Sequence, residues 1–438
     1  MLTHLELVFR KNTTNFTDLV LVRFLFRYLL NSIINLDLNM NGIRKLYLVL
    51  IFFTNLSFSG WAQIKQLSPQ AQISVITCGS GTDLYTAFGH SAFRVTDPAQ
   101  RLDVVYNYGT FDFDPPGFYV DFAKGKLDYK LSKQDYPRFL FTYELEQRWV
   151  KEQQLQLSLE QKNKLYSFLE KNNLPQNQEY PYDFFYDNCA TKIKDVLQLV
   201  LGSDLVYDAS YIDTPNTFRA LIYQNVPTNS WSALGIDIAL GAVIDKEASP
   251  EQHMFLPDYV RLQMAEATLD NNPLIRKEND LLNVNAPAKE TLFFATPLFW
   301  MLLALVLIGG CTWRDYKNNS RSRWLDFILF LSTGIIGLLI VFLWFFTNHT
   351  ATVSNFNMLW AFVPNLVLAF FLLGKKPLSS WTKKYIGLLL GLLVLIFVLW
   401  VMKIQVFNIV LLPLFLAFGI RYTFLAFFFK QAHTAPTL

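Results

Sequence analysis

The sequence contains few cysteines and few histidines. Among 438 residues there are three cysteines, Cys78, Cys189 and Cys311, and five histidines. Three cysteines are too few for a disulfide framework, although they allow one bridge. The cysteines and histidines show no paired spacing of metal ligands, so we expect no metal site. Chemistry that uses a cysteine and a histidine together therefore has few partners to choose from.

Several enzyme signatures are also missing. The chain has no Gly-x-Ser-x-Gly, no His-Glu-x-x-His and no phosphate-binding glycine loop. The net charge is only +3, and no basic patch with interleaved aromatic residues occurs. We therefore expect neither nucleic acid nor a bound cofactor.

Long apolar runs fill the C-terminal third. Five stretches are each close to the ~20 residues that cross a bilayer, and they predict an all-α bundle of five transmembrane helices: 292–312, 326–346, 358–374, 385–402 and 406–429. The loops 314–323 and 375–384 are rich in lysine and arginine, which places them in the cytoplasm. The loop 347–357, called here the external loop, then lies on the periplasmic side of the inner membrane.

The composition of the rest of the chain predicts the domain organisation. Residues 63–270 have the composition of a soluble domain, which the topology places in the periplasm. We expect a polar linker at 271–290, the membrane domain at 291–430 and a cytoplasmic tail at 431–438. The protein is therefore expected in the inner membrane, crossing it several times.

The N-terminal region has the pattern of a targeting segment. A short basic stretch from Met40 is followed by an apolar core and then by small residues before Gln63. This layout predicts a signal peptide at 40–62. We interpret residues 1–39 as a mis-called extension; the alternative is that the apolar run 19–30 lies on a membrane.

The most informative stretch surrounds Cys189. An aromatic run ends at Asp187 and Asn188, and an apolar pattern with helical spacing follows from Ile193. Aspartate and asparagine are preferred N-cap residues, so a helix should start at about Cys189. The amides and the dipole of a first helical turn lower the pKa of a thiol and stabilise an oxyanion. Cys189 is thus a candidate nucleophile, and the alternatives are a structural cysteine or a disulfide with Cys78.

His90 is the candidate base. It begins one of the strands expected at 73–77, 91–95, 103–109 and 127–131, and a helix is expected at 152–172. A cysteine nucleophile needs an imidazole beside it, and the imidazole needs an orienting group. Four residues remain open for that third role: Asp83, Tyr106, Asn107 and Asp112. His253 is a competing base, ranked lower because it lies in a polar, loop-like stretch.

Four motifs together resemble the Lnb family of the Bacteroidetes: Phe88-Gly-His-Ser-Ala-Phe-Arg94, Tyr106-Asn-Tyr-Gly-Thr-Phe-Asp-Phe113, Tyr186-Asp-Asn-Cys-Ala-Thr191 and Phe255-Leu-Pro-Asp-Tyr259. The external loop, with His349, Asn355 and Asn357, also resembles that family, although an ordinary polar loop is the simpler interpretation of these residues by their chemistry. The resemblance covers roughly residues 70–430. It implies an α+β, papain-like (NlpC/P60-like) periplasmic domain, in which His precedes Cys, followed by the membrane helices.

The resemblance also implies an activity. Lnb proteins are lipoprotein N-acyltransferases, and by this likeness Cys189 would be the nucleophile and His90 the base. The candidate supporting residues are Asn188, Tyr106, Asp112, His349, Asn355 and Asn357. The acyl donor would be a phospholipid, and the acceptor the α-amine of a diacylglyceryl-cysteine lipoprotein. Two alternatives stay open: a cell-wall amidase or endopeptidase that uses the same pair, and a non-catalytic membrane assembly factor with Cys78 and Cys189 in a disulfide.

Overall fold

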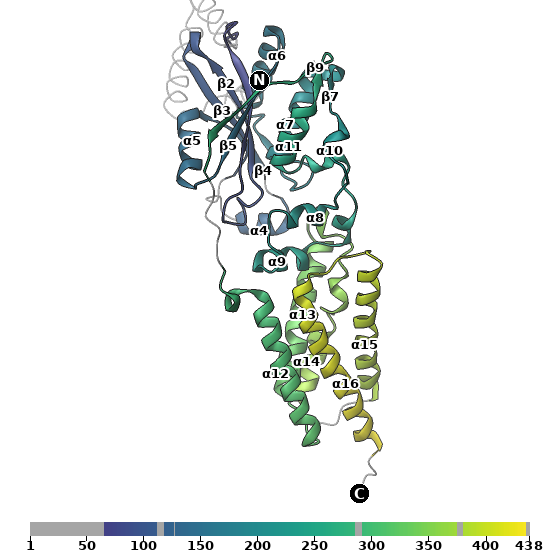
Figure 1. The fold of residues 1–438 in the computed structure, drawn as a ribbon. Helices are drawn as coiled ribbons and strands as arrows, with labels where there is room; N and C mark the ends of the chain where they lie inside the picture. Colours follow the sequence, from purple (N-terminus) through teal and green to yellow (C-terminus); the bar gives the residue numbers. More distant parts are fainter. Residues whose placement is uncertain (1–64, 112–117, 127, 285–290, 375–379, 435–438) are drawn as a thin grey trace, which may run out of the picture. The chain divides into compact units, whose positions relative to one another are not determined.

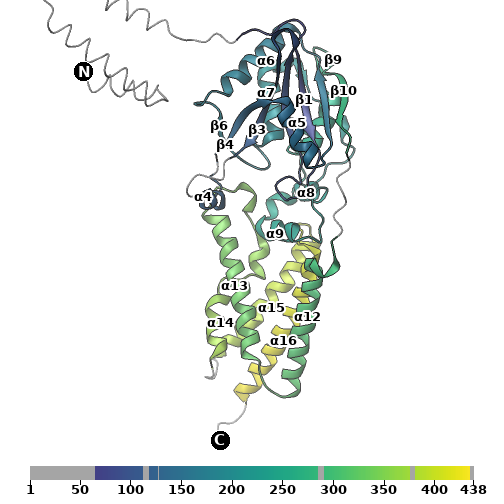
Figure 2. The same ribbon diagram turned by 90° about the vertical axis from the view of Figure 1, so that its left-hand side faces the viewer.

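The structure is a computed structural model that describes residues 65–111, 118–126, 128–284, 291–374 and 380–434. The expected extension and signal peptide lie outside these residues. The first part of the described chain is built on a seven-stranded antiparallel sheet (Figures 1 and 2). In spatial order its strands are β10 (Ile275–Leu282), β5 (Val150–Leu155), β1 (Gln72–Cys78), β2 (His90–Asp97), β3 (Leu102–Thr110), β4 (Asp128–Asp135) and β6 (Glu179–Pro181).

The central strands are covered on both faces. Six of the seven residues of β1 are buried, which explains its run of isoleucine, valine and cysteine. Helix α5 (Tyr136–Leu145) covers one face, and α6 (Leu159–Asn172) and α7 (Cys189–Leu201) lie on the other (Figure 1). The apolar stripe of α7 predicts this packing, since Ile193, Val196, Leu197, Val200 and Leu201 are all buried. Each such side chain stabilises the fold by about 1.5–3 kcal/mol.

Short elements complete this domain. The other helices are α4 (Phe118–Lys124), α8 (Phe218–Tyr223), α9 (Trp231–Ala239), α10 (Pro250–His253) and α11 (Pro257–Glu266). A second sheet is formed by β7 (Leu205–Val206), β8 (Thr268–Leu269) and β9 (Asn272–Pro273). Short 3-10 helices are η1 (Pro98–Gln100), η2 (Gly202–Asp204), η3 (Ala209–Tyr211) and η4 (Ala242–Asp245).

The four strands expected before residue 135 are confirmed, but two other predictions are wrong. The helix expected at 152–172 starts only at Leu159, after a capping box made by Ser158 and Gln161, and residues 150–155 form β5. Within the expected linker 271–290, Ile275–Leu282 is the edge strand β10, paired with β5. Both errors have one cause. These strands are rich in polar residues, and their pairing with distant strands overrides local preference.

Residues 291–374 and 380–434 of the membrane region form five α-helices: α12 (Pro297–Lys317), α13 (Arg323–Phe345), α14 (Asn365–Leu373), α15 (Ser380–Val401) and α16 (Leu412–Thr434). Four 3-10 helices accompany them: η5 (Phe293–Ala295), η6 (Thr350–Thr352), η7 (Phe356–Leu359) and η8 (Ile409–Leu411). In the described part, four helices are long and apolar enough to cross a membrane: α12, α13, α15 and α16. The prediction of five spans is therefore not confirmed.

The third predicted span, 358–374, differs most. Its helix α14 has only nine residues, and the chain before it runs as 3-10 turns. Irregular backbone is tolerated at membrane depth where protein buries it. Helix α13 gives the room for this, since a Cβ on Gly337 would lie 2.0 Å from the carbonyl oxygen of Ala361. The small residue Gly337 on α13 thus lets the irregular backbone before α14 pack closely against α13.

A buried ion cluster holds three of the long helices together. Arg421 on α16 is fully buried and pairs with Asp326 on α13 at 2.7 Å and Asp315 on α12 at 2.8 Å. Arg321 pairs with the same Asp326 at 3.1 Å. Charges inside a membrane region are costly unless paired, so this cluster fixes how the three helices meet.

Candidate active site

Cys189 is the first residue of α7, as the capping pattern predicts. Asn188 is the N-cap, and its Oδ1 accepts hydrogen bonds from the amides of Ala190 (2.8 Å) and Thr191 (2.9 Å). The Nδ2 group of Asn188 donates to the carbonyl oxygens of Phe184 (2.7 Å) and Phe255 (2.8 Å). Asn188 is buried, so these bonds are shielded from water. The supporting role expected for Asn188 is thus to hold the turn that carries the thiol.

The imidazole of His90 lies beside this thiol and bonds to both Cys189 and Asn107. His90 starts β2, and Asn107 lies on the neighbouring strand β3. Oδ1 of Asn107 accepts a hydrogen bond from Nε2 of the imidazole. This bond orients the ring and leaves Nδ1 as the nitrogen available to the thiol. Of the four residues left open for the third role, Asn107 is therefore the one that the structure brings to His90.

The charges of the pair favour a thiolate and an imidazolium. Burial by itself raises the pKa of the Cys189 thiol, but the charge of His90, its hydrogen bond and the amides of Ser91 and Ala190 outweigh burial and lower that pKa below its usual value. Burial likewise lowers the pKa of His90, yet the charge of Cys189 and the bonds to Cys189 and Asn107 leave it raised. Each shift stabilises the charged form of its own group.

The other cysteine of this domain is a different kind of thiol. Cys78 pairs in register with His90 across β1 and β2, and it is only 1% exposed. Burial raises its pKa to about 12. Cys78 and Cys189 are both free thiols in the structure, so the disulfide considered as an alternative is not formed.

Alkylation should separate these two thiols. We expect iodoacetamide to modify Cys189 of the native protein and to leave Cys78 unmodified, since only Cys189 is both partly exposed and able to ionise. The rate should stay high well below the usual pKa of a thiol and fall only when the pH drops through the lowered pKa of Cys189.

The matched variant for this measurement is His90→Ala. It removes the counter-charge but leaves the burial, so the pKa of Cys189 should rise above its usual value, and the rate at pH 7 should fall about 100-fold. Peptide mapping by mass spectrometry measures both rates. An unchanged pH profile in His90→Ala would contradict the ion pair.

A small space beside the thiol is left open by Gly109. This glycine is the residue before the last of β3 and has a φ of 84°, a left-handed conformation that residues with a side chain rarely adopt. A Cβ there would lie 3.4 Å from Cβ of Cys189, 3.9 Å from its amide nitrogen and 3.9 Å from the hydroxyl oxygen of Tyr180. The amide of Cys189 opens the helix, so it has no acceptor within α7. Two donors and the nucleophile thus surround one vacant position.

Tyr180 was not found by the sequence analysis. Its hydroxyl is buried without a hydrogen-bond partner among the described residues; the Gly109 amide faces it without making a bond of normal geometry. Burial raises the pKa of Tyr180 strongly, so it stays protonated and able to donate. The signal in the sequence is weak, because Tyr180 is one of four tyrosines and phenylalanines between 180 and 185 and only the sheet pairing of β6 selects it.

Three of the other expected residues, Tyr106, Asp83 and His253, are described by the structure and do not lie at this site. The hydroxyl of Tyr106 bonds to Glu170 on α6, because neighbours on a strand point to opposite faces and Asn107 takes the face of His90. Asp83 is exposed on the loop between β1 and β2. Asp112 lies outside the described residues. The competing base His253 is fully buried, with Nδ1 on the carbonyl oxygen of Ser249 (2.8 Å) and Nε2 accepting from the amide of Asn216 (3.2 Å).

The residues of the external loop lie at contacts with the periplasmic domain. His349 packs on Gly125: a Cβ added to Gly125 would lie 3.1 Å from Nδ1 of His349. Asn355 and Asn357 are buried, and their side-chain amides bond to backbone carbonyls of α9. Among the contacts of the described residues, neither asparagine bonds to Cys189 or His90, so Asn355 and Asn357 are not part of the pair itself.

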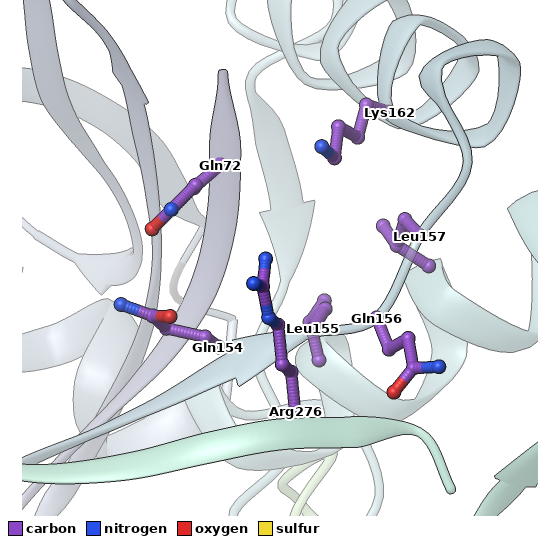
Figure 3. Close-up of a pocket in the computed structure, with 7 residues that line it drawn as sticks. All are labelled: Gln72, Gln154, Leu155, Gln156, Leu157, Lys162 and Arg276. Carbon is purple, nitrogen blue, oxygen red and sulfur yellow. The ribbon is translucent and has the colours of Figure 1, made fainter. Parts of the chain in front are cut away.

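The cavity in Figure 3 is far from the thiol along the sheet. It has a volume of about 300 Å³ and is lined by Gln72, Gln154, Leu155, Gln156, Leu157, Lys162 and Arg276. Gln72 starts β1 and Leu155 ends β5, whereas Cys78 and Val150 are at the opposite ends of these strands, where His90 lies. This cavity is therefore separate from the candidate active site.

The fold and the site define a membrane protein whose periplasmic domain, of mixed α and β structure, carries a cysteine–histidine pair at a helix start. Comparison with protein families gives two matches: residues 58–224 match the Lnb N-terminal periplasmic domain, and residues 288–432 match the Lnb transmembrane domain. Together they cover more than two thirds of the chain. The chain belongs to the Lnb family.

Membership of this family indicates a membrane protein of lipoprotein processing with a periplasmic domain. No curated protein and no solved structure matches the chain. The papain-like character expected for the periplasmic domain is therefore not confirmed, and the observed fold stands as the seven-stranded antiparallel sheet with helices on both faces.

Proposed function

We propose that this protein is a lipoprotein N-acyltransferase. It moves a fatty acyl chain from a phospholipid to Cys189 and from there to the α-amine of a diacylglyceryl-cysteine lipoprotein. The observation that carries the proposal is the constellation of Cys189, His90 and Asn107, with Cys189 at the start of α7 and the vacant position of Gly109 beside it. Family membership supplies the link to lipoproteins.

In the first step the thiolate of Cys189 attacks the carbonyl carbon of an acyl ester. A carbon–sulfur bond forms, and the carbonyl oxygen becomes an oxyanion in the space beside Gly109, where the amide of Cys189 and the hydroxyl of Tyr180 donate to it. When the oxyanion collapses, the carbon–oxygen bond breaks and His90 gives its proton to the leaving alkoxide. A lysophospholipid leaves, and an S-acyl enzyme remains with a neutral His90.

In the second step the free amine of the lipoprotein attacks the thioester. His90 takes a proton from the nitrogen, a carbon–nitrogen bond forms and the carbon–sulfur bond breaks. The thiolate and the imidazolium are restored together, so the enzyme returns to its starting charge state. Asn107 holds the imidazole in one orientation throughout, which suits a base that acts in both steps.

The location of the pair suits substrates held in a membrane. Cys78, His90, Val150 and Leu282 meet at one end of the sheet, and the chain continues from Leu282 toward the first long helix, α12. Asp183, six residues before Cys189, bonds directly to Thr350 of the external loop. Tethering two lipid substrates and the thiol to one surface raises their effective concentration.

The test is the mass of a lipoprotein N-terminal peptide. We expect expression of this protein, in a host depleted of its own N-acyltransferase, to convert that peptide from a diacylated to a triacylated form. The depleted host alone is the control. A diacylated peptide despite protein in the membrane would overturn the proposal, and release of wall peptides by the purified protein would then favour the amidase alternative.

A further inference from the structure

The external loop reaches the turn that carries the nucleophile. Thr350 Oγ1 donates a hydrogen bond of 2.6 Å to Asp183 Oδ2. The other oxygen of Asp183 accepts the amides of Phe185 (2.9 Å) and Tyr186 (3.0 Å). The backbones of Asp183 and Asp187 also pair with each other. One hydroxyl of the membrane region is therefore bonded to the carboxylate that shapes the turn before Asn188 and Cys189.

The far end of the same loop holds α9. Asn355 Nδ2 donates to the carbonyl oxygens of Ile238 (2.8 Å) and Ala239 (3.0 Å), and Asn357 Nδ2 donates to that of Asp237 (2.7 Å). Carbonyls at the end of a helix lack partners within the helix, so these amides satisfy acceptors that burial would leave unpaired. A Cβ on Gly241 would lie 2.0 Å from the carbonyl oxygen of Val353, so the two chains are also in close contact.

A buried ion group joins α9 to α8 within the periplasmic domain. Asp237 pairs with Arg219 on α8, and Arg219 also pairs with Asp245 at 2.8 Å. Asn408, from the segment between α15 and α16, donates to Asp237 Oδ2 at 2.7 Å. Arg219 and Asp237 are at most 2% exposed, so the group is held rigidly.

The last link to the active site is aromatic. Phe218, next to Arg219 on α8, packs against Phe185 with ring centroids 5.0 Å apart and against Phe255 at 5.8 Å. The carbonyl oxygen of Phe255 is bonded to the side chain of Asn188. Two physical connections thus join the membrane region to the cap of α7: a short one through Thr350 and Asp183, and a longer one through α9 and α8.

We propose that the external loop is a positioning element of the active site. It holds Cys189 at a fixed place relative to the bilayer, where ester lipids of the membrane can acylate the thiolate. Acylation of the thiolate by an ester in solution does not depend on the loop. This inference rests on the proposed function. In this inference Thr350 and Asn355 position the thiolate relative to the lipid. The reactivity of the thiolate is set by His90 and by the start of α7.

The experiment compares three measurements on the full-length protein in proteoliposomes of phosphatidylethanolamine and phosphatidylglycerol. The first is the rate of alkylation of Cys189 by iodoacetamide. The second is the burst of nitrophenolate released from p-nitrophenyl butyrate in solution. The third is the amount of S-acyl enzyme formed from the phospholipid, read by mass spectrometry. The variants are Thr350→Val, which removes one bond of an exposed residue, and Asn355→Ala.

The matched control is Thr347→Val. Thr347 belongs to the same loop, but its hydroxyl donates to the carbonyl oxygen of Leu343 and accepts from the amide of His349, both within the membrane region. We expect Thr350→Val to lower S-acylation by phospholipid about ten-fold, and Asn355→Ala further, because small displacements of reacting groups are costly. Alkylation and the nitrophenolate burst should stay within two-fold of wild type, and Thr347→Val should match wild type in all three.

The outcomes separate this inference from the proposed function. Equal S-acylation in wild type and Thr350→Val, or a parallel fall in all three measurements, would overturn the positioning role and leave the acyltransferase intact. A wild-type protein that is alkylated normally but never S-acylated by phospholipid would overturn the proposed function itself.

Discussion

Replacement of Cys189 by alanine is expected to lower N-acylation of lipoproteins by about 10⁴-fold or more, because no other group can form the thioester. The variant should still fold, since Asn188 and Thr191 keep the capping bonds of α7 without the sulfur. The measurement is the ratio of triacylated to diacylated N-terminal peptide in the depleted host. The S-acyl enzyme should be absent as well.

Cys311→Ala is the matched control for this loss. Cys311 lies on α12 of the membrane region, so its thiol is on a different element from the pair. We expect wild-type acylation from this variant. Acylation that survives in Cys189→Ala would exclude Cys189 as the nucleophile. Equal loss in both variants would instead indicate a general effect of removing a cysteine.

Tyr180→Phe should have the second largest effect, a loss of about 10²- to 10³-fold in S-acylation, as for the removal of one oxyanion donor. The phenylalanine keeps the ring contacts of Tyr180, which has Tyr108 at 6.1 Å and the Lys192 ammonium at 4.3 Å. Its native hydroxyl has no partner among the described residues, so the change breaks no bond in the folded state. Stability should therefore stay constant or rise slightly.

The readouts for Tyr180→Phe separate an oxyanion donor from a structural residue. The pH dependence of Cys189 alkylation should match that of wild type, because alkylation forms no oxyanion. Tyr108→Phe is the control, since Tyr108 is the neighbouring tyrosine and its hydroxyl bonds to Asn172 at 2.6 Å. That variant should lose stability but keep S-acylation within about three-fold. Similar S-acylation in the two variants would show that the hydroxyl of Tyr180 does not donate to the oxyanion.

The comparison with the sequence analysis shows where local patterns suffice. The start of α7 at Cys189 follows from Asp187, Asn188 and the apolar spacing, because capping is a local interaction. The strands β1, β2 and β3 are equally well predicted, because apolar runs and apolar–polar alternation are local patterns. By contrast, the local sequence of β5 predicts a helix and that of β10 predicts a linker. Their polar residues form strands only because β5 pairs with β1 and β10 pairs with β5.

The site shows the same division. Scarcity of cysteine and histidine left Cys189 and His90 as almost the only pair, but four residues remained open as the orienting group. The choice of Asn107 over Tyr106 depends on which face of β3 meets His90, and that is set by the register of β2 with β3. The proximity of Tyr180 and Gly109 depends on the order of β3, β4 and β6 in the sheet, which no local pattern encodes.

By itself, the sequence determined the candidate pair of Cys189 and His90, the periplasmic domain and the positions of the long membrane helices. Caps, apolar runs and residue scarcity suffice for these because they act over a few turns or on composition. Only the tertiary structure decided the partner of His90, the donors beside Gly109, the nine-residue α14 and the roles of Asn355 and Asn357. These depend on contacts between residues separated by many tens to hundreds of positions, such as Asn357 with Asp237. Their geometry exists only once the sheet and the membrane helices have packed.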